Sequence, residues 1–271
     1  MIKILDGKKL AKKVLDELKK DIQKLPNKPR LLVLMIGENR ASRVFVRKKQ
    51  EACRILGIIF RLKKISSKFS TARVCRVMAE EIKNFAPDGI VIQLPLPSGI
   101  NTTKVLACIP RRLDVEGFAG GKIISPVARG IAALLREYGL SVKNKNIAVV
   151  GAGRLVGKPV SKLLRDLGGK VKVFDRETKD LAGKIRKADI VISGAGKPNL
   201  IQGAMLKPGA VVIDAGASMA AGKIQGDVDF TTVSSRASYL APVPGGVGPL
   251  TVAMLLVNLV ELAQGKALNY R

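Results

Sequence analysis

The sequence N-I-A-V-V-G-A-G-R-L-V-G-K-P-V-S, residues 146–161, decides the fold. It begins as a short apolar strand, continues through Gly151, Gly153 and Gly157, and is expected to enter a helix. In a dinucleotide-binding unit the first glycine makes the turn, and the second lets the backbone approach a pyrophosphate at the helix N-terminus. The spacing is one residue longer than the usual fingerprint, with Val156 where the third glycine normally stands. The motif predicts a dinucleotide site, and the alternative is a glycine-rich turn that binds nothing.

The segment that follows favours the dinucleotide site. A second strand is predicted over residues 170–174, and it ends in Asp175 and Arg176. An acidic residue at this position holds ribose hydroxyls, and an arginine accommodates a 2′-phosphate, so NAD and NADP both remain open. Strand-then-helix units recur at residues 188–193 and 210–216. This pattern predicts a wound parallel sheet with ligands at the carboxyl ends of its strands.

The composition indicates a globular protein and excludes several kinds of chemistry. The chain has 271 residues, of which 47% are hydrophobic, enough for two domains with apolar cores. With no apolar run long enough to span a membrane and no signal peptide, we expect a cytoplasmic protein without a membrane partner. Cys53, Cys75 and Cys108 are expected to be reduced and mostly buried. Because the chain has no histidine, histidine triads and histidine metal sites are excluded, and we expect no metal.

The formal charge of +27 raises the possibility of a nucleic-acid partner. However, the basic residues are spread along predicted helices, and aromatic residues make up only 4% of the chain. The chain therefore has few aromatic rings on which bases could stack, and a lysine-rich solvated surface explains the charge better. Such a surface attracts small polyanions, so we expect no nucleic-acid partner.

The N-terminal part offers one candidate amine. A helix is predicted over residues 42–57 with Gly57 as its C-cap, and it places Phe45 and Lys49 on one face. One interpretation is a surface lysine lying across a core phenylalanine; the other is a site. Without histidine, a lysine is one of the few groups that can move protons.

Two further stretches predict ligand contacts through rigid backbone. A strand at residues 89–93 ends at Gln93, the first residue of Q-L-P-L-P, and places a polar group where α/β sites lie. Residues 242–249, P-V-P-G-G-V-G-P, can bring backbone N–H and C=O groups close to a flat ligand. Residues 1–119 are predicted to form a first domain, joined by the C-terminal helix 250–271, and residues 120–249 are predicted to form the dinucleotide-binding domain.

Several separated stretches resemble one family, and together they cover nearly the whole chain. They are I-L-D-G-K (4–8), A-S-R-V-F-V-R-K-K (41–49), V-I-Q-L-P-L-P (91–97), V-G-K-P (156–159), G-D-V-D-F (226–230) and P-V-P-G-G-V-G-P-L-T (242–251). On these motifs the chain resembles the bifunctional methylenetetrahydrofolate dehydrogenase/methenyltetrahydrofolate cyclohydrolase family.

The resemblance implies an α/β fold of two αβα domains. The N-terminal domain would be a parallel-sheet catalytic domain and the C-terminal domain a Rossmann-like NAD(P)-binding domain, with the active site in the cleft between them. The implied reaction oxidises 5,10-methylenetetrahydrofolate to the methenyl form with NADP as hydride acceptor, NAD being possible. Water addition then gives 10-formyltetrahydrofolate. The resemblance also implies tetrahydrofolate derivatives as partners and a homodimer.

The resemblance assigns roles to residues of this chain. The catalytic residues would be Lys49, Gln93 and Glu116. The substrate-binding residues would be Phe45, Leu94, Pro95, Pro244, Gly245 and Gly246. The cofactor-binding residues would be Gly151, Gly153, Arg154, Leu155, Val156, Asp175, Arg176, Gly194, Ala195, Gly196, Ala215 and Gly216.

The chain departs from the family pattern at four places. Phe45 replaces a tyrosine, which removes a phenol and puts the cyclohydrolase step in doubt more than hydride transfer. Glu116 replaces an aspartate, and the segment up to Gly130 is shortened. In the glycine turn the family's G-R-S becomes G-A-G with the arginine moved to Arg154. Arg154 and Arg176 together favour NADP, whereas Asp175 favours NAD.

Three alternatives remain beside the bifunctional enzyme. The first is a dehydrogenase that has lost the hydrolytic step. The second is another Rossmann oxidoreductase acting on a small hydroxy acid, which leaves Q-L-P-L-P and P-V-P-G-G-V-G-P unexplained. The third is a basic nucleic-acid binder that kept a Rossmann-like core, supported only by the charge.

Overall fold

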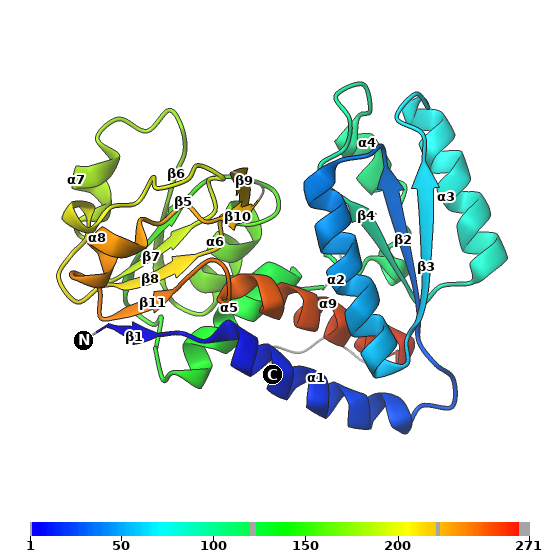
Figure 1. The fold of residues 1–271 in the computed structure, drawn as a ribbon, viewed down its shortest axis with the longest axis horizontal. Helices are drawn as coiled ribbons and strands as arrows, with labels where there is room; N and C mark the ends of the chain where they lie inside the picture. Colours follow the sequence, from blue (N-terminus) through cyan, green and yellow to red (C-terminus); the bar gives the residue numbers. More distant parts are fainter. Residues whose placement is uncertain (1, 120–122, 221–222, 266–271) are drawn as a thin grey trace. The chain divides into compact units, whose positions relative to one another are not determined.

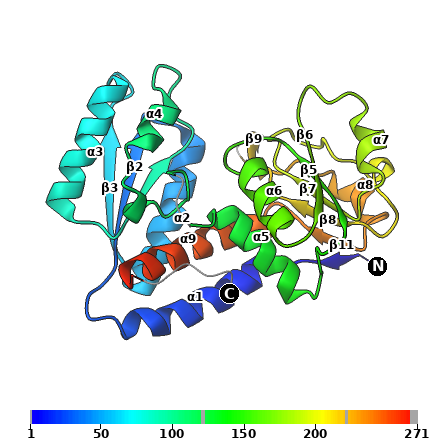
Figure 2. The same cartoon turned by 180° about the vertical axis from the view of Figure 1, so that it is seen from behind.

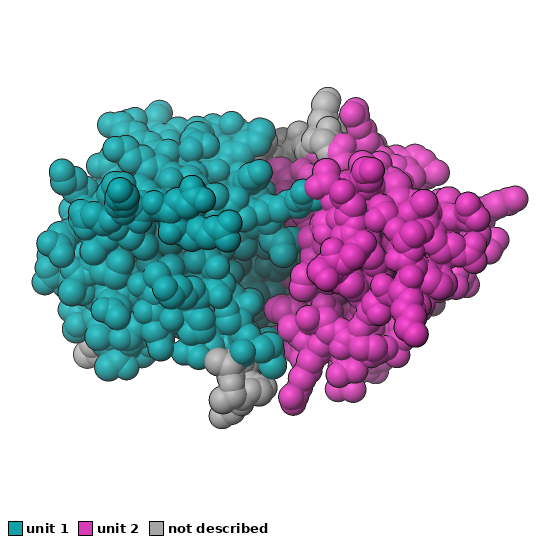
Figure 3. All heavy atoms as spheres, turned by 90° about the horizontal axis from the view of Figure 1, so that it is seen from above, with its two compact units in different colours: residues 1–13, 127–251 teal, residues 14–126, 252–271 magenta. Residues whose placement is uncertain are grey.

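The computed structural model describes residues 2–119, 123–220 and 223–265, and Figures 1 and 2 show it from two sides. The chain forms two compact units, which Figure 3 colours separately. Unit 1 contains residues 1–13 and 127–251, and unit 2 contains residues 14–126 and 252–271.

Unit 1 is built on a six-stranded sheet in the order β1-β11-β8-β7-β5-β6, with every neighbouring pair parallel. The strands are β1 (Lys3–Ile4), β11 (Tyr239–Ala241), β8 (Val211–Asp214), β7 (Ile190–Ser193), β5 (Asn146–Val150) and β6 (Lys170–Phe174). Strands β7 and β8 are buried along their whole length, as a parallel sheet covered on both faces requires. Because β6 and β7 flank β5, the winding reverses there, and such reversals are where α/β sheets bind ligands.

Unit 1 also contains helices and a pair of antiparallel strands. They are α5 (Pro126–Glu137), α6 (Gly157–Asp166), α7 (Leu181–Ile185), α8 (Phe230–Ser234), and the antiparallel pair β9 (Ser218–Ala220) and β10 (Lys223–Gln225). In the part of the chain that the structure describes, no helix has both the length and the apolar character to cross a membrane.

Unit 2 is built on a three-stranded parallel sheet in the order β3-β2-β4. The strands are β2 (Arg30–Ile36), β3 (Ile59–Ile65) and β4 (Gly89–Gln93). Alternate residues of β2 enter two core clusters, because successive side chains of a strand point to opposite faces. One cluster includes side chains of α1 (Gly7–Gln23), α2 (Arg40–Leu56) and α9 (Val247–Ala263). The other includes side chains of α3 (Thr71–Phe85) and α4 (Thr102–Ala107).

The two-unit α/β fold with parallel sheets confirms the predicted fold class, but the structure divides the chain differently at its N-terminus. Residues 1–13 belong to unit 1 and not to the unit of residues 14–126. The cause is pairing of β1 with β11, reinforced by hydrogen bonds from Asp6 N–H to the Tyr138 hydroxyl (2.9 Å) and from Lys8 N–H to the Gly245 carbonyl (2.9 Å). The predicted domain boundary lies between residues 119 and 120. Residues 120–122 lie outside the described part of the chain.

The expectation that all three cysteines are reduced and mostly buried is wrong for two of them. Cys75 on α3 and Cys108 at the end of α4 form a disulfide, with their Cα atoms 6.1 Å apart. Cys108 is exposed and Cys75 is only partly buried. Cys53 agrees with the expectation, because it is a free thiol buried in the core.

We expect the disulfide to be measurable as a thiol count and as stability. The protein unfolded without reductant should show one reactive thiol, from Cys53, and three after reduction. The bridge closes a segment of 33 residues, so a chain-entropy model gives it up to about 4 kcal/mol of stabilisation. Reduction should therefore lower the unfolding midpoint of the wild type but not of a Cys108→Ala variant. Three reactive thiols before reduction would contradict the bridge.

Candidate functional site

Lys49 is held in the interior of unit 2 by helix α2. The helix begins after Asn39, whose side chain accepts the N–H of Ser42 at 2.9 Å, and ends at Gly57 in the left-handed conformation. Lys49 is 7% exposed, and its Nζ donates to Oε1 of Gln93 at 2.9 Å. A lysine is rarely buried in a core without a purpose, because the ammonium loses its hydration.

Gln93 is oriented by the backbone at the exit of β4. Its Nε2 donates to the carbonyl of Leu94 at 2.8 Å, and Ser42 Oγ donates to the same carbonyl at 3.4 Å. The peptide between Leu94 and Pro95 is cis. Because Nε2 is engaged, the amide presents Oε1 to Lys49, as the assignment of Gln93 beside the amine requires.

A buried aspartate shapes the turn that carries Glu116. Oδ1 of Asp114 accepts the N–H groups of Glu116 (3.1 Å) and Gly117 (2.9 Å), and Oδ2 accepts that of Ala119 (2.6 Å). Gly117 has φ +77°, a conformation that favours glycine. The turn thus fixes the backbone of Glu116 before any ligand contacts it.

Asn258 on α9 supports the same turn. It is fully buried, and its Nδ2 donates to the carbonyls of Val115 and Ile124, both at 2.9 Å. Our sequence interpretation missed Asp114, Asn258 and Ser42 as parts of this region. The available signal was a single amide within the apolar run T-V-A-M-L-L-V-N-L-V.

Burial shifts the pKa values of three ionisable groups in this region: Lys49, Glu116 and Cys53. Burial lowers the pKa of Lys49, and Glu116 and Cys53 oppose this effect. Burial raises the pKa of Glu116 to about 7; Lys49 opposes the rise and Asp114 adds to it. Burial raises the pKa of Cys53 to about 12, so this thiol stays protonated. Glu116 therefore titrates near pH 7 close to an amine whose pKa is lowered by burial, and the charge of each group affects the pKa of the other.

The structure excludes one of the two interpretations of Phe45 and Lys49, that of a surface lysine lying across a phenylalanine. The cation over the Phe45 ring is Lys48, with its Nζ 5.9 Å from the ring centroid. Lys49 is not a surface lysine lying across that ring, because it is buried and bonded to Gln93. Phe45 itself is only partly buried, which leaves part of its ring available to a ligand.

The glycine turn of unit 1 has the close packing that its motif predicts. A side chain on Gly151, which has φ +104°, would collide with the backbone of Gly194, and one on Gly157 would collide with the Gly151 carbonyl. Gly157 therefore acts as the glycine that lets helix α6 approach the turn, while Val156 contacts the Gly194 position. A Cβ on Gly153 would meet nothing within 4 Å. The turn is tight at its base and open at Gly153, which fits the pyrophosphate of NAD(P).

The other predicted cofactor residues follow the neighbouring strands of unit 1. Asp175 and Arg176 are exposed after β6, and Oδ1 of Asp175 accepts the N–H of Glu177 and the hydroxyl of Thr178, both at 3.1 Å. Arg154 is exposed. The remaining residues lie in the glycine turn or after β7 and β8: Leu155, Gly194, Ala195, Gly196, Ala215 and Gly216.

The predicted substrate loop Pro244–Gly246 lies in unit 1, directly after β11. The peptide from Val243 to Pro244 is cis, and Gly245 has φ +109° with nothing within 4 Å of a Cβ placed there. The N–H of Gly246 donates to the carbonyl of Pro242 at 2.8 Å. Pro244 is exposed, Gly245 is partly buried and Gly246 is buried, and the Gly245 carbonyl accepts the N–H of Lys8.

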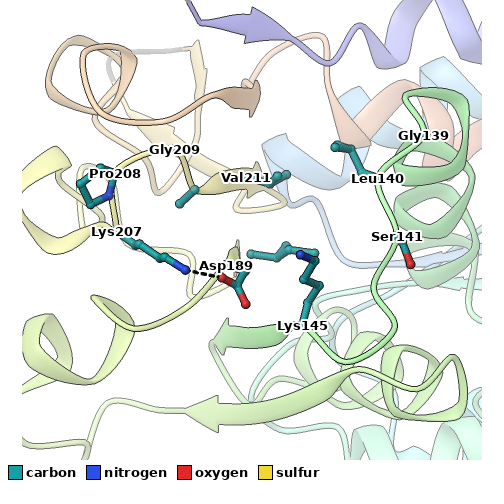
Figure 4. A pocket seen from close by; sticks show the side chains of 11 residues that line it. Gly139, Leu140, Ser141, Lys145, Asp189, Lys207, Pro208, Gly209 and Val211 are labelled. Atoms are coloured by element: carbon teal, nitrogen blue, oxygen red, sulfur yellow. Dashed lines mark hydrogen bonds and ion pairs between the residues drawn. The ribbon is translucent and has the colours of Figure 1, made fainter.

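A pocket of about 440 Å³ lies in unit 1 by the amino ends of strands β5, β7 and β8, at the other end of these strands from the predicted cofactor residues (Figure 4). Lys207 Nζ bridges Asp189 Oδ1 at 2.6 Å across it, and Lys145 also lines it. Hydrogen bonds from Lys207 and from the N–H of Asn146 lower the pKa of Asp189. Because the carboxylate offsets the lysines, we assign this pocket no ligand.

Comparison with known proteins places both units in one family. Residues 5–116 match the tetrahydrofolate dehydrogenase/cyclohydrolase catalytic domain, and residues 125–267 match the NAD(P)-binding domain of the same family. The chain is 42% identical to the bifunctional protein FolD of Nitratiruptor sp., with 97% of this chain and 98% of that protein covered.

Solved structures support the same family assignment. The crystal structure of the FolD dehydrogenase/cyclohydrolase from Campylobacter jejuni matches with a TM-score of 0.92 at 35% identity, covering 98% of this chain and 99% of that chain. The Trypanosoma brucei FolD structure, a complex with NADP cofactor and inhibitor, matches with a TM-score of 0.91 at 30% identity, covering 97% and 98%. The chain, with its buried lysine and its glycine turn, therefore belongs to the tetrahydrofolate dehydrogenase/cyclohydrolase family.

Proposed function

We propose that the chain oxidises 5,10-methylenetetrahydrofolate to the methenyl form with NADP and then hydrolyses the product to 10-formyltetrahydrofolate. The observation that supports this proposal most is the buried hydrogen bond between Lys49 and Gln93, together with the nearby Glu116 carboxyl, whose pKa is raised to about 7. An acid–base pair without histidine suits a hydrolysis that needs protons moved at neutral pH. Tetrahydrofolate derivatives are then the substrates, and by the same resemblance we propose a homodimer.

Each residue of unit 2 takes a role that its surroundings support. Lys49 moves the proton, because burial lowers the pKa of its amine. Gln93 fixes the amine through its Oε1. Glu116 anchors the polar edge of the pterin, Phe45 stacks on the ring, and Leu94 and Pro95 line the strand exit.

We propose that the glycine turn and the loops after β6, β7 and β8 hold NADP, which supplies the hydride acceptor. The support is the open space at Gly153 and the close packing of Gly151 and Gly157. The Trypanosoma brucei relative was solved with NADP. Arg154 and Arg176 are our candidates for the 2′-phosphate, since an arginine donates paired N–H hydrogen bonds to phosphate oxygens.

Arg176→Ser should weaken NADP binding by roughly 10-fold and NAD binding much less, since it removes a charged hydrogen bond made only by the 2′-phosphate. Kd values for both dinucleotides, measured by fluorescence titration, check this. Lys179→Ser is the matched control, because Lys179 is another exposed cation in the same segment. Equal losses for NADP and NAD would contradict the assigned contact.

The enzymatic proposal is tested by one assay. Purified protein is given 5,10-methylenetetrahydrofolate with NADP or NAD, and reduced cofactor and methenyl product are followed before and after acid quenching. Reduction without methenyl accumulation supports both activities. Methenyl accumulation supports the second candidate, a dehydrogenase alone, which Phe45 favours because it lacks the phenol. No reduction with either cofactor would overturn the proposal.

A further inference from the structure

Two carboxylates are buried beneath the loops at the carboxyl ends of β7 and β8. Asp227 is 0% exposed and Asp214 is 2% exposed. Neither belongs to the residues that the glycine motif or the family resemblance assigned to the cofactor. A buried carboxylate persists only when hydrogen bonds replace its hydration, so the partners of these two groups reveal their role.

Asp227 gathers its donors from the loop that follows β7. Its Oδ2 accepts the Ser193 hydroxyl (2.8 Å) and the N–H groups of Ala195 (2.7 Å) and Gly196 (3.2 Å). Its Oδ1 accepts the N–H of Lys197 at 2.8 Å. Successive backbone N–H groups converging on one point form an anion-binding nest, and here the chain's own carboxylate fills it.

Asp214 fixes the segment that carries Asp227. Its Oδ1 accepts the N–H groups of Gly216 (2.9 Å) and Asp227 (3.1 Å), and its Oδ2 accepts that of Val228 (3.0 Å). A side chain on Gly216 would collide with the Asp227 carboxylate. The loops after β7 and β8 are therefore locked to each other through the two carboxylates.

The location gives this network a consequence for ligand binding. Gly194 to Gly196 lie beside the glycine turn, because a side chain on Gly151 would strike the Gly194 backbone. The N–H groups of residues 195–197 are the kind of donors that attract a phosphate, yet they are already satisfied. The phosphates of a dinucleotide would therefore be bound by N–H groups of the glycine turn. The loop after β7 would contact the dinucleotide in a shape that is already fixed.

We propose that Asp227 is a positioning residue for the dinucleotide, whose carboxylate fills the nest after β7 and holds that loop in its binding shape before the cofactor arrives. This rests on the proposed function, in that the ligand is taken to be NADP. Preorganisation lowers the ordering cost of binding, so loss of the carboxylate should weaken cofactor affinity and leave the chemical step largely unchanged.

The test is Asp227→Asn with Asp229→Asn as control. The asparagine has the same shape but presents an amide N–H₂ to a cluster of N–H donors, so part of the nest loses its acceptor. Asp229 is two residues further on, and its carboxylate instead caps α8 by accepting the N–H groups of Thr231 and Thr232. Binding is measured by titrating NADP into folate-free protein, and turnover is measured separately at saturating NADP.

We expect Asp227→Asn to raise the Kd for NADP by roughly 10-fold, with kcat at saturating NADP and the folate KM within about twofold. Amide hydrogen exchange at residues 195–197 of the ligand-free protein should also become faster. Asp229→Asn should change neither. Unchanged NADP affinity and unchanged exchange in Asp227→Asn would overturn the proposal.

Ser193→Ala keeps the test decisive if Asp227→Asn fails to fold, because it removes one donor and leaves the carboxylate. A smaller rise in Kd, about threefold, supports the proposal, and no rise overturns it. Wild-type protein that binds NADP but does not oxidise the folate would remove the proposed reaction and leave the positioning role standing. Wild-type protein that binds neither NADP nor NAD would overturn both.

Discussion

Replacing Lys49 by methionine is expected to lower cyclohydrolase turnover by about 10³-fold, within the range that a positioned acid–base group contributes. Methionine nearly matches the lysine side chain in length and suits a buried site, so the loss should reflect the missing amine. Gln93 would lose the donor that its Oε1 accepts at 2.9 Å. The dehydrogenase rate should fall less, because hydride transfer depends mainly on orientation.

The measurement is the decay of methenyltetrahydrofolate absorbance under single-turnover conditions, with circular dichroism as a check on folding. Lys48→Met is the matched control: Lys48 is the adjacent residue of α2, is exposed, and lies over the Phe45 ring. Its removal should change turnover by no more than about threefold, as expected for an exposed cation–π contact. Full cyclohydrolase activity in Lys49→Met would eliminate the role assigned to this amine.

The elements that could be predicted are those whose signals are local. Strand 89–93 and strand 170–174 are found with the predicted bounds, because apolar runs bounded by turn residues are strand signals. Gly57 ends helix α2 in the left-handed conformation, as its C-cap role requires. By contrast, β1 has only two residues, and it exists because it pairs with β11 more than 200 positions later. A two-residue segment contains no sequence signal for a partner strand so far along the chain.

The candidate site could be predicted only in part, for the same reason. Spacing along α2 indicated a shared face for Phe45 and Lys49, but the partner of Lys49 lies 44 residues away at the end of β4. Family resemblance supplied that pairing; periodicity could not. Asp114 and Asp227 are surrounded by backbone donors that are assembled only by folding. In the sequence Asp114 carries no signal of this kind, and Asp227 is part of the G-D-V-D-F motif, which does not reveal what the carboxylate binds.

The disulfide shows how composition can mislead. Three scattered cysteines without a regular spacing favour reduced thiols, which is correct for Cys53. Cys75 and Cys108 meet because α3 and α4 cover the same side of the sheet in unit 2, where their apolar residues share one core cluster. The pairing is a property of helix packing and has no signature in sequence spacing.

Replacing Glu116 by glutamine is expected to reduce the loss of folding stability at high pH and to weaken folate binding. The folded state raises the pKa of Glu116 from 4.5 to about 7, so folding favours the protonated carboxyl. Its contribution to stability is therefore fully present below pH 4.5 and is lost as the pH rises through 7. The loss is at most about 3 kcal/mol, and part of it is offset because an ionised Glu116 stabilises the buried ammonium of Lys49.

Urea unfolding at pH 5 and pH 8 measures this difference. The wild type should lose stability between the two values, and Glu116→Gln should lose about 1–2 kcal/mol less. Burial also raises the pKa of Asp214, to about 6, and that contribution remains in both proteins as a common decline. Glu80→Gln, at an exposed position of α3, is the control and should follow the wild type. A variant with the same pH dependence as the wild type would show that Glu116 is not the group that titrates.

The same substitution should raise the folate KM by roughly 10-fold, because the amide no longer offers a charged acceptor to the pterin edge. The two effects have one origin. The Glu116 carboxyl is held by the Asp114 turn near a buried lysine, and its ionisation is unfavourable in the protein without ligand. A ligand that is cationic or donates N–H groups would stabilise the ionised form and offset this cost. A gain in stability without any loss of folate affinity would separate them, and would make Glu116 a strained residue with no part in substrate binding.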